Sequence, residues 1–142
     1  MNKRYFEDFV VGEVMSLPGR PISRSEIIAF AAEYDPQPMH LDEEVARASM
    51  LGGLAASGWH TCCLMMRIIS DGLMSRSHFL GAPGVDEVRW LAPLRPDEHV
   101  DVRANIVDTR ASRSRPGVGK LPWTSSWMNA LVAVRSYGCS CK

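Results

Sequence analysis

The sequence predicts an α+β fold in which a curved, largely antiparallel sheet wraps one long central helix. The first observation is the stretch from Ser57 to Met74, where polar residues share one narrow face of a helical wheel and apolar residues cover most of the rest. A helix that is apolar around most of its circumference must be covered by other elements. The second observation is that residues 100–106 alternate apolar and polar side chains, the period of a half-buried strand. Residues 85–91 are also expected to be extended.

The residues before the central helix predict an extended segment followed by a short helix. Residues 5–17 mix apolar and polar side chains and end at a Pro-Gly pair, which is typical of a strand or strand pair closed by a turn. Ser23 and Glu26 then form a capping-box pattern, in which each side chain can satisfy the free backbone amide of the other residue. We therefore expect an amphipathic helix over residues 24–34.

Residues 35–40 predict a stiff loop, because each of its two prolines lacks a backbone donor and favours an extended predecessor. A second short helix is expected to begin at Asp42, since Glu43 and Glu44 would lie in its first turn, where the helix dipole favours negative charge. After residues 85–91, the stretch Pro93–Asp97 reads as a turn.

Length and composition predict one domain over residues 1–142. Apolar residues make up 46% of the chain and charged residues 23%, which is ordinary for a globular protein. The formal net charge is zero, which argues against nucleic acid as the main partner. No signal peptide or membrane span is evident, so we expect a cytoplasmic protein without a membrane partner. The four cysteines do not form a Cys-x-x-Cys motif, and we expect no structural metal.

Asp35 and His40 are the candidate catalytic pair. They stand at the two ends of the proline-braced loop, which can hold a carboxylate and an imidazole at a fixed separation. A water molecule between the two groups could donate to both and be deprotonated as it attacks an electrophilic carbon. General acid–base catalysis of this kind contributes roughly 10²- to 10⁴-fold. The alternative interpretation is an ordinary turn beside a structural histidine.

The start of the central helix is a candidate oxyanion site. A helix N-terminus presents unpaired amides and the positive end of the dipole, both suited to a thioester oxygen that gains negative charge. Gly58 has no side chain to block close approach, so its amide could polarise that oxygen. Ordinary capping by Ser57 is the alternative. His60 and Arg67, on the polar face of the helix, could bind substrate or contact a partner subunit; simple solvation or a salt bridge with Asp71 is the alternative.

These residues resemble the MaoC-like dehydratase family, which includes the R-specific enoyl-CoA hydratases. Its first motif is similar to residues 34–42 (YDPQPMHLD), and its second, an apolar run into His-Gly, is similar to residues 54–60 (LAASGWH). The opening YFEDF and the VRW that begins at Val88 are also similar, so the likeness covers residues 5–119. The resemblance implies a hot-dog fold, named for a sheet wrapped around a helix, which usually pairs into dimers.

The resemblance also implies reversible addition of water across the double bond of a trans-2-enoyl thioester. Asp35 and His40 would hold and activate the water, and the Gly58 amide would bind the thioester oxygen. Ser57, Gln37 and Trp59 fall at positions expected to contact substrate. Coenzyme A is then expected as part of the substrate, with no fixed cofactor. A homodimer or larger assembly is expected, because a lone hot-dog unit leaves a sheet edge exposed.

The sequence departs from the family pattern in three places. Gln37 stands where the family usually has Asn, and Ser57 where it has His. The tail, residues 120–142, is atypical, and we interpret it as an altered or frame-shifted end. Within it, Pro122 suits an edge strand better than a central one.

Three functions remain open. The favoured one is a lyase that hydrates or dehydrates an acyl-CoA. The second is a hot-dog thioesterase, which would direct water at the thioester carbonyl, and the third is a non-catalytic acyl-binding or assembly module. Thioesterases of this fold commonly place their carboxylate on the central helix, where this chain offers only Asp71, near the far end. That position favours the hydratase.

Overall fold

The computed structural model describes residues 3–127 and 132–141, with side chains as far as Ser126. Its helices, in chain order, are η1 (Phe6–Asp8), α1 (Arg24–Tyr34), α2 (Pro38–Leu41), α3 (Glu43–Ala48), α4 (Gly58–Gly72) and η2 (Met74–Arg76). Its strands are β1 (Val14–Pro21), β2 (Phe79–Gly81), β3 (Val85–Trp90), β4 (His99–Ile106), β5 (Arg110–Ala111), β6 (Gly119–Trp127) and β7 (Val132–Cys141).

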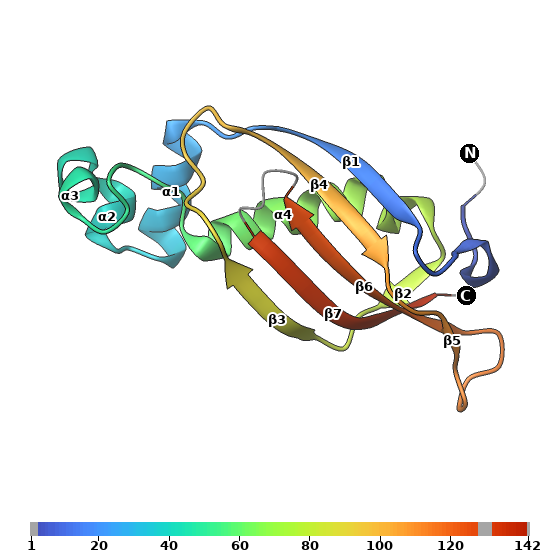
Figure 1. Cartoon of the computed structure of the whole chain (residues 1–142). Helices are drawn as coiled ribbons and strands as arrows, with labels where there is room; N and C mark the ends of the chain where they lie inside the picture. Colours follow the sequence, from blue (N-terminus) through green and yellow to red (C-terminus); the bar gives the residue numbers. More distant parts are fainter. Residues whose placement is uncertain (1–2, 128–131, 142) are drawn as a thin grey trace.

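The strands form one antiparallel sheet that curls along α4, as Figure 1 shows. The order across the sheet is β1-β4-β6-β7-β2, with β3 also paired to β7 and the short β5 paired to β6. Helices α1, α2 and α3 lie together beyond one end of the sheet, next to the N-terminal end of α4 (Figure 1). The predicted α+β fold, with a sheet wrapped around a central helix, is confirmed.

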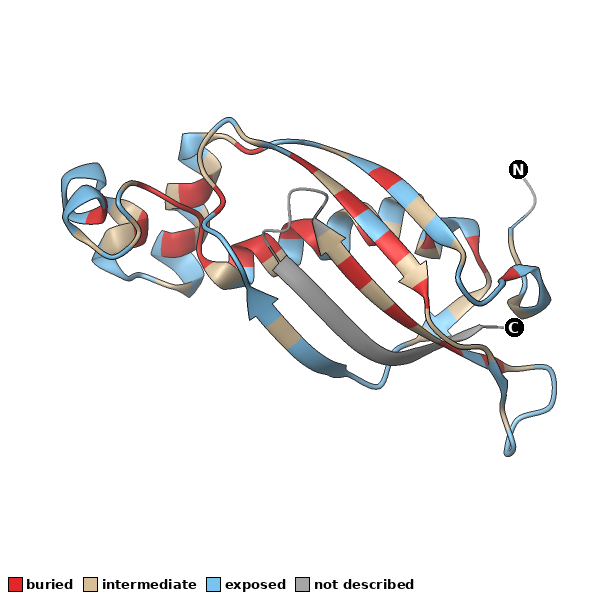
Figure 2. Ribbon diagram, in the orientation of Figure 1, coloured by how far each residue is buried: buried red, intermediate tan, exposed pale blue. Residues whose placement is uncertain are grey.

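The core lies between α4 and the concave face of the sheet. On α4 the buried apolar side chains are Leu64, Met65 and Ile69. Strand β4 alternates as its sequence predicts, with Val100, Val102, Ala104 and Ile106 buried and the residues between them more exposed (Figure 2). Because burying one such aliphatic side chain contributes roughly 1.5–3 kcal/mol, this layer fixes the position of α4 against the sheet.

Local capping explains where the short helices begin. Ser23 and Glu26 form the predicted capping box, with each side chain bonded to the other residue's backbone amide. Asp42 caps α3 by accepting hydrogen bonds from the amides of Glu44 and Val45. The capping patterns therefore predict the starts of α1 and α3 correctly.

Residues 35–40 do not form a loop throughout, which corrects the expectation from their prolines. Pro38 begins the single helical turn α2, and His40 lies inside that turn. The reason is that proline at the first helical position loses no hydrogen bond and already has a helical φ angle. His40 is therefore held by helical geometry in addition to the prolines.

Two strands run through prolines that were expected to end or exclude them. Strand β1 continues past Pro18 and Gly19 to Pro21, with a break in its register against β4 between Leu17 and Arg20. Pro122 lies in β6, between β4 and β7 rather than at an edge, so its predicted placement is wrong. The register of β6 against β7 shifts between Leu121 and Trp123, and such an irregularity removes the need for a donor at the intervening residue.

Cys139 and Cys141 belong to β7, and their side chains lie outside the described part of the chain. No helix among the described residues has the length and apolar character needed to cross a membrane.

Candidate active site

Asp35 lies at the C-terminal end of α1, where its backbone amide donates to the carbonyl of Ala31. Both of its carboxylate oxygens accept hydrogen bonds. Gln37 donates from Nε2 to Oδ1 at 2.7 Å, and the Ser57 hydroxyl donates to Oδ2 at 2.5 Å. The carboxylate is therefore held in one orientation by two neutral donors that come from two different segments.

His40 is 5% exposed and is oriented by a backbone carbonyl. Its Nδ1 lies 2.9 Å from the carbonyl oxygen of Ala55. Because a carbonyl oxygen only accepts, Nδ1 must carry the hydrogen in this contact. In the neutral ring Nε2 is then the acceptor, and this tautomer is set by the contact with Ala55.

The acceptor nitrogen of His40 faces the carboxylate of Asp35. Nε2 lies 3.8 Å from Oδ2, which is too long for a direct hydrogen bond. A water that donates to two acceptors at ordinary hydrogen-bond lengths holds them roughly 4.4 Å apart, so a small separation of the two side chains would admit a shared water. The structure thus brings together the two side chains that the sequence nominated.

Hydrogen bonding sets the charge state of Asp35. The hydrogen bond from Ser57, and after it the one from Gln37, hold the pKa of the Asp35 carboxyl below its ordinary value, while the nearby His40 contributes less. Since both donors favour the ionised form, Asp35 is suited to accept hydrogen bonds and to stabilise a nearby positive charge.

The first turn of α4 lies beside this pair, because Ala55 and Ser57 immediately precede Gly58. Ser57 is fully buried and caps α4, accepting from the amide of Trp59 while it donates to Asp35. Gly58 opens the helix, where an amide has no acceptor one turn earlier. The geometry thus places a helix N-terminus next to the paired carboxylate and imidazole.

Trp90, from β3, covers Gly58. A Cβ atom built on Gly58 would lie 2.6 Å from Cε2 and Nε1 of Trp90, so only glycine fits without moving the indole. Trp59 meets Trp90 edge to face, with ring centroids 5.5 Å apart, and both rings are about half exposed. The two indoles form a wall beside the first turn of α4.

The polar face predicted for α4 is not uniformly solvated. His60 is 6% exposed, its ring stacks on Phe30 with centroids 4.3 Å apart, and Nδ1 is buried without a hydrogen-bond partner in the described structure. Burial lowers the pKa of His60, an effect that Glu26 partly opposes. Solvation of His60 is therefore the wrong alternative, since α1 covers it. Arg67, in contrast, forms an exposed ion pair with Asp71.

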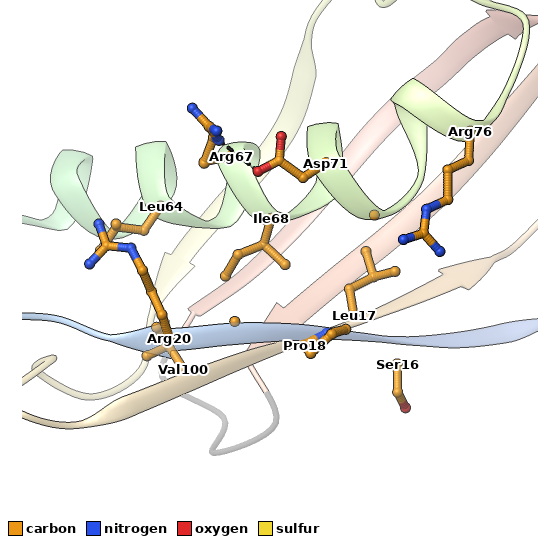
Figure 3. A pocket seen from close by; sticks show the side chains of 12 residues that line it. Ser16, Leu17, Pro18, Arg20, Leu64, Arg67, Ile68, Asp71, Arg76 and Val100 are labelled. Carbon is orange, nitrogen blue, oxygen red and sulfur yellow. Dashed lines mark hydrogen bonds and ion pairs between the residues drawn. The ribbon is translucent and has the colours of Figure 1, made fainter.

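A separate cleft of about 610 Å³ lies between β1 and α4 (Figure 3). Ile68 points from α4 toward β1, and Arg20 and Arg76 stand at its two ends. Neither Asp35 nor His40 lines this cleft. Three of its charged side chains are already paired, Arg67 and Asp71 with each other and Arg20 with Glu26. Among the described residues, no group of three potential ligands is arranged to hold a metal ion.

Comparison with known proteins agrees with the motif and the geometry. The model of the MaoC like domain matches residues 8–123, which is most of the chain. The chain belongs to this family. The structure of a MaoC-like dehydratase from Rhodospirillum rubrum superposes with a TM-score of 0.89 at 31% identity, covering 98% of this chain and 97% of that one. Family membership supports hydratase or dehydratase chemistry as a general class.

Two further relatives extend the comparison of this MaoC-like chain. The uncharacterised protein YdeM of Bacillus subtilis is 27% identical over 113 residues, 79% of each chain. An (R)-hydratase from A. caviae, involved in PHA biosynthesis, shares the fold with a TM-score of 0.65 at 20% identity, covering 95% of this chain and 98% of that one. The family model ends at Trp123, inside β6, so the atypical tail begins close to the end of the match.

Sequence reasoning missed two contributors to the site. The carbonyl of Ala55 orients His40 across fifteen residues, and a backbone acceptor leaves no mark in the sequence. Trp90 was noted only as part of a family-like stretch, and its contact with Gly58 depends on how β3 pairs in the sheet.

Proposed function

We propose that this chain adds water to, or removes it from, the double bond of a 2-enoyl-CoA thioester, with Asp35 and His40 as its catalytic pair. The observation that carries the proposal is the 3.8 Å separation of two acceptor atoms, Nε2 of His40 and Oδ2 of Asp35. In this proposal the two acceptors separate slightly and orient one water by both of its hydrogens. Such a water presents an oxygen lone pair to an electrophilic carbon.

His40 is the group proposed to move the proton. In hydration the water oxygen bonds to C3 of the substrate while one water proton passes to Nε2 of His40. The electrons of the C2–C3 double bond shift toward the thioester oxygen and form an enolate. The enolate then collapses, C2 takes the proton from Nε2, and His40 returns to its starting state. Asp35 stays ionised throughout and stabilises the imidazolium, as its donors Ser57 and Gln37 favour.

The first turn of α4 is proposed to stabilise the enolate oxygen. The Gly58 amide opens that helix, and the positive end of the helix dipole favours charge that develops there. Ser57 and Gln37 act in this scheme through Asp35 rather than on the substrate itself, because both of their side chains bond to its carboxylate. Trp59 and Trp90 would line the approach of the acyl thioester.

The family of this chain and the proteins that share its fold support the proposed hydration or dehydration. The R. rubrum relative is described as a MaoC-like dehydratase and the A. caviae protein as an (R)-hydratase. A thioesterase is less well supported, because Asp71, the carboxylate of α4, is exposed and pairs with Arg67 in the last turns of the helix. A binding module without catalysis is supported by neither of these descriptions.

An assay with crotonyl-CoA tests the proposal. Loss of the enoyl absorbance without release of free thiol is the expected result, and Asp35→Asn should abolish most of it while the fold is preserved. Thiol release at an undiminished enoyl signal would instead establish a thioesterase. Absence of both changes, with a folded protein and a range of acyl lengths, would leave a binding module as the correct reading.

We further propose that a second copy of the chain docks on β3. The opposite edge of the sheet, β1, carries Pro18 and Pro21, which have no backbone donor and so discourage edge pairing. Strand β3 lacks proline and is largely exposed (Figure 2). A two-fold axis through Val88, perpendicular to the sheet, would place Glu87 opposite Arg89 of the partner subunit. By symmetry this contact would occur twice in the dimer. The same axis would leave both central helices on the same face.

A further inference from the structure

Arg95 donates to three backbone carbonyls of the segment that leads into α4. Its guanidinium donates from Nη1 to the carbonyl of Gly53 at 2.6 Å and to that of Leu54 at 3.2 Å, and from Nη2 to the carbonyl of Leu51. A planar guanidinium can serve several carbonyls at once because its donors lie in a fixed fork, whereas an ammonium group has no such fork.

Leu94 and Arg95 form a strap that lies against this segment, and the backbone of the strap also holds Ala56. The carbonyl of Leu94, which is 1% exposed, accepts from the amide of Ala56 at 2.8 Å. Arg95 is itself anchored, since its amide donates to Glu98 at 2.7 Å. Residues 51–56 are thus fixed on both sides of Ala55, by carbonyls up to Leu54 and by the amide of Ala56.

The carbonyl of Ala55 is the group that orients His40. The Ala55 carbonyl shares a peptide plane with the Ala56 amide, which donates to Leu94, and the peptide before it is held where the Leu54 carbonyl accepts from Arg95, so the two contacts together limit its direction. That carbonyl accepts from Nδ1 of His40 at 2.9 Å and so leaves Nε2 as the acceptor that faces Asp35. A chain of contacts therefore runs from the guanidinium through the backbone to the imidazole.

We infer that Arg95 is a positioning residue for the proposed reaction, which selects the His40 tautomer by fixing the carbonyl of Ala55. It does not touch the reacting atoms in this scheme. Its removal should let residues 51–55 adopt several arrangements, so that both neutral tautomers of His40 become populated. The inference rests on the proposed function for its catalytic consequence, but the tautomer itself is observable without any substrate.

Nitrogen-15 NMR of the histidine side chains at about pH 8 tests this step directly. The His40 signals are assigned by their absence in His40→Gln. The variants are Arg95→Met, which keeps the stem and loses every donor, and Arg95→Lys, which keeps the charge without the fork. Arg110→Ala is the matched control, because it removes an exposed arginine paired only with Asp108 at the far hairpin.

We expect one Nδ1-protonated tautomer in the wild type and in Arg110→Ala, and averaged Nδ1 and Nε2 shifts in both Arg95 variants. With enoyl-CoA, kcat should fall about tenfold or more while KM changes little, since misplacing a catalytic group costs mainly the chemical step. If Arg95→Met does not fold, the same measurements on Arg95→Lys decide the question. Wild-type His40 shifts in a folded Arg95 variant would overturn the inference. An inactive wild type with the predicted NMR shifts would instead count against the proposed function alone.

Discussion

The hydroxyl of Ser57 lies 2.5 Å from Oδ2 of Asp35 and donates to it, joining the cap of α4 to the end of α1. The same hydroxyl oxygen accepts from the amide of Trp59. One side chain therefore caps the central helix, orients a carboxylate and favours its ionised form. This link explains why Asp35 stays beside the first turn of α4 although the two residues are far apart in the chain.

Ser57→Ala should destabilise the protein most at neutral pH. The folded-state pKa of Asp35 is held below its ordinary value, so its stabilisation is present above about pH 4 and is lost as the pH falls through the folded-state value. A lost hydrogen bond to a charged group costs roughly 1.5–3 kcal/mol, and a lost cap about 1 kcal/mol. Urea unfolding at neutral pH and near pH 3 should show the difference from wild type shrinking to the cap contribution. Ser75→Ala, which removes an exposed hydroxyl, is the control, and an acid-independent difference would contradict the role of Asp35.

Asp35→Asn and His40→Gln should each lower kcat by roughly 10²-fold or more in a protein that still folds. Asn still accepts from Ser57 through its carbonyl but no longer carries the charge that stabilises an imidazolium. Gln has no group that can take up and return a proton at neutral pH. The double variant should be scarcely worse than either single one, because the two residues act on one water. Steady-state kinetics with an enoyl-CoA checks this, and additive losses would show that the two side chains act independently.

Sequence patterns over a few residues correctly predicted helices α1 and α3 and strand β4. The capping box at Ser23 predicted α1, the acidic first turn after Asp42 predicted α3, and alternation predicted β4. Elements decided by pairing across the sheet were less predictable. Pro122 is accommodated in β6 because the register shifts there, and that shift is a property of the pairing with β7, which the residues of β6 alone do not show.

In the candidate site, too, features that depend on neighbouring residues were predictable and features that depend on contacts between distant segments were not. Asp35 and His40 were predictable because a short stretch carries both, and proline limits its conformations. The tautomer of His40 was not, because it depends on the carbonyl of Ala55, fifteen residues away. The burial of His60 beneath Phe30 likewise depends on how α1 packs on α4, which a helical wheel of α4 alone does not contain.

The effect of Gly58→Ala on stability should change sign with the residue at position 90. In the wild type the new Cβ would lie 2.6 Å from the indole of Trp90, and such overpacking costs roughly 1–3 kcal/mol. In a Trp90→Ala background that obstacle is gone, and replacing glycine in a helix is favourable by up to about 1 kcal/mol. A double-mutant cycle measured by urea unfolding gives the coupling directly. Stabilisation by Gly58→Ala in both backgrounds would mean that the indole swings away freely.

His60→Phe should make the protein more resistant to mild acid. Burial lowers the folded-state pKa of His60, so the unfolded chain takes up a proton at about pH 6.5 while the folded chain does not. Stability is therefore lost as the pH falls below about 6.5, and phenylalanine, which can keep the stack on Phe30, removes this loss. Unfolding free energies at about pH 7.5 and pH 5.5 should differ less in His60→Phe than in the wild type. The exposed His99→Gln variant should keep the wild-type difference, and an unchanged slope in His60→Phe would show that His60 is not the acid-sensitive group.

Charge reversal on β3 tests both the docking edge and its register. If Val88 lies on the two-fold axis, Glu87 meets Arg89 of the partner subunit, and opposite charges across strands contribute roughly 0.2–1 kcal/mol each. Glu87→Arg or Arg89→Glu alone would create two like-charge contacts, and each should shift the assembly toward monomer. The double variant Glu87→Arg with Arg89→Glu restores opposite charges at both contacts and should recover the dimer. Reversal of Arg20, on the proline-containing edge strand β1, is the control and should leave the assembly unchanged. Sedimentation velocity over a range of concentrations distinguishes these states. A dimer dissociation constant that neither single reversal raises would place the interface elsewhere, because a symmetric pairing about Val88 cannot avoid the repulsion.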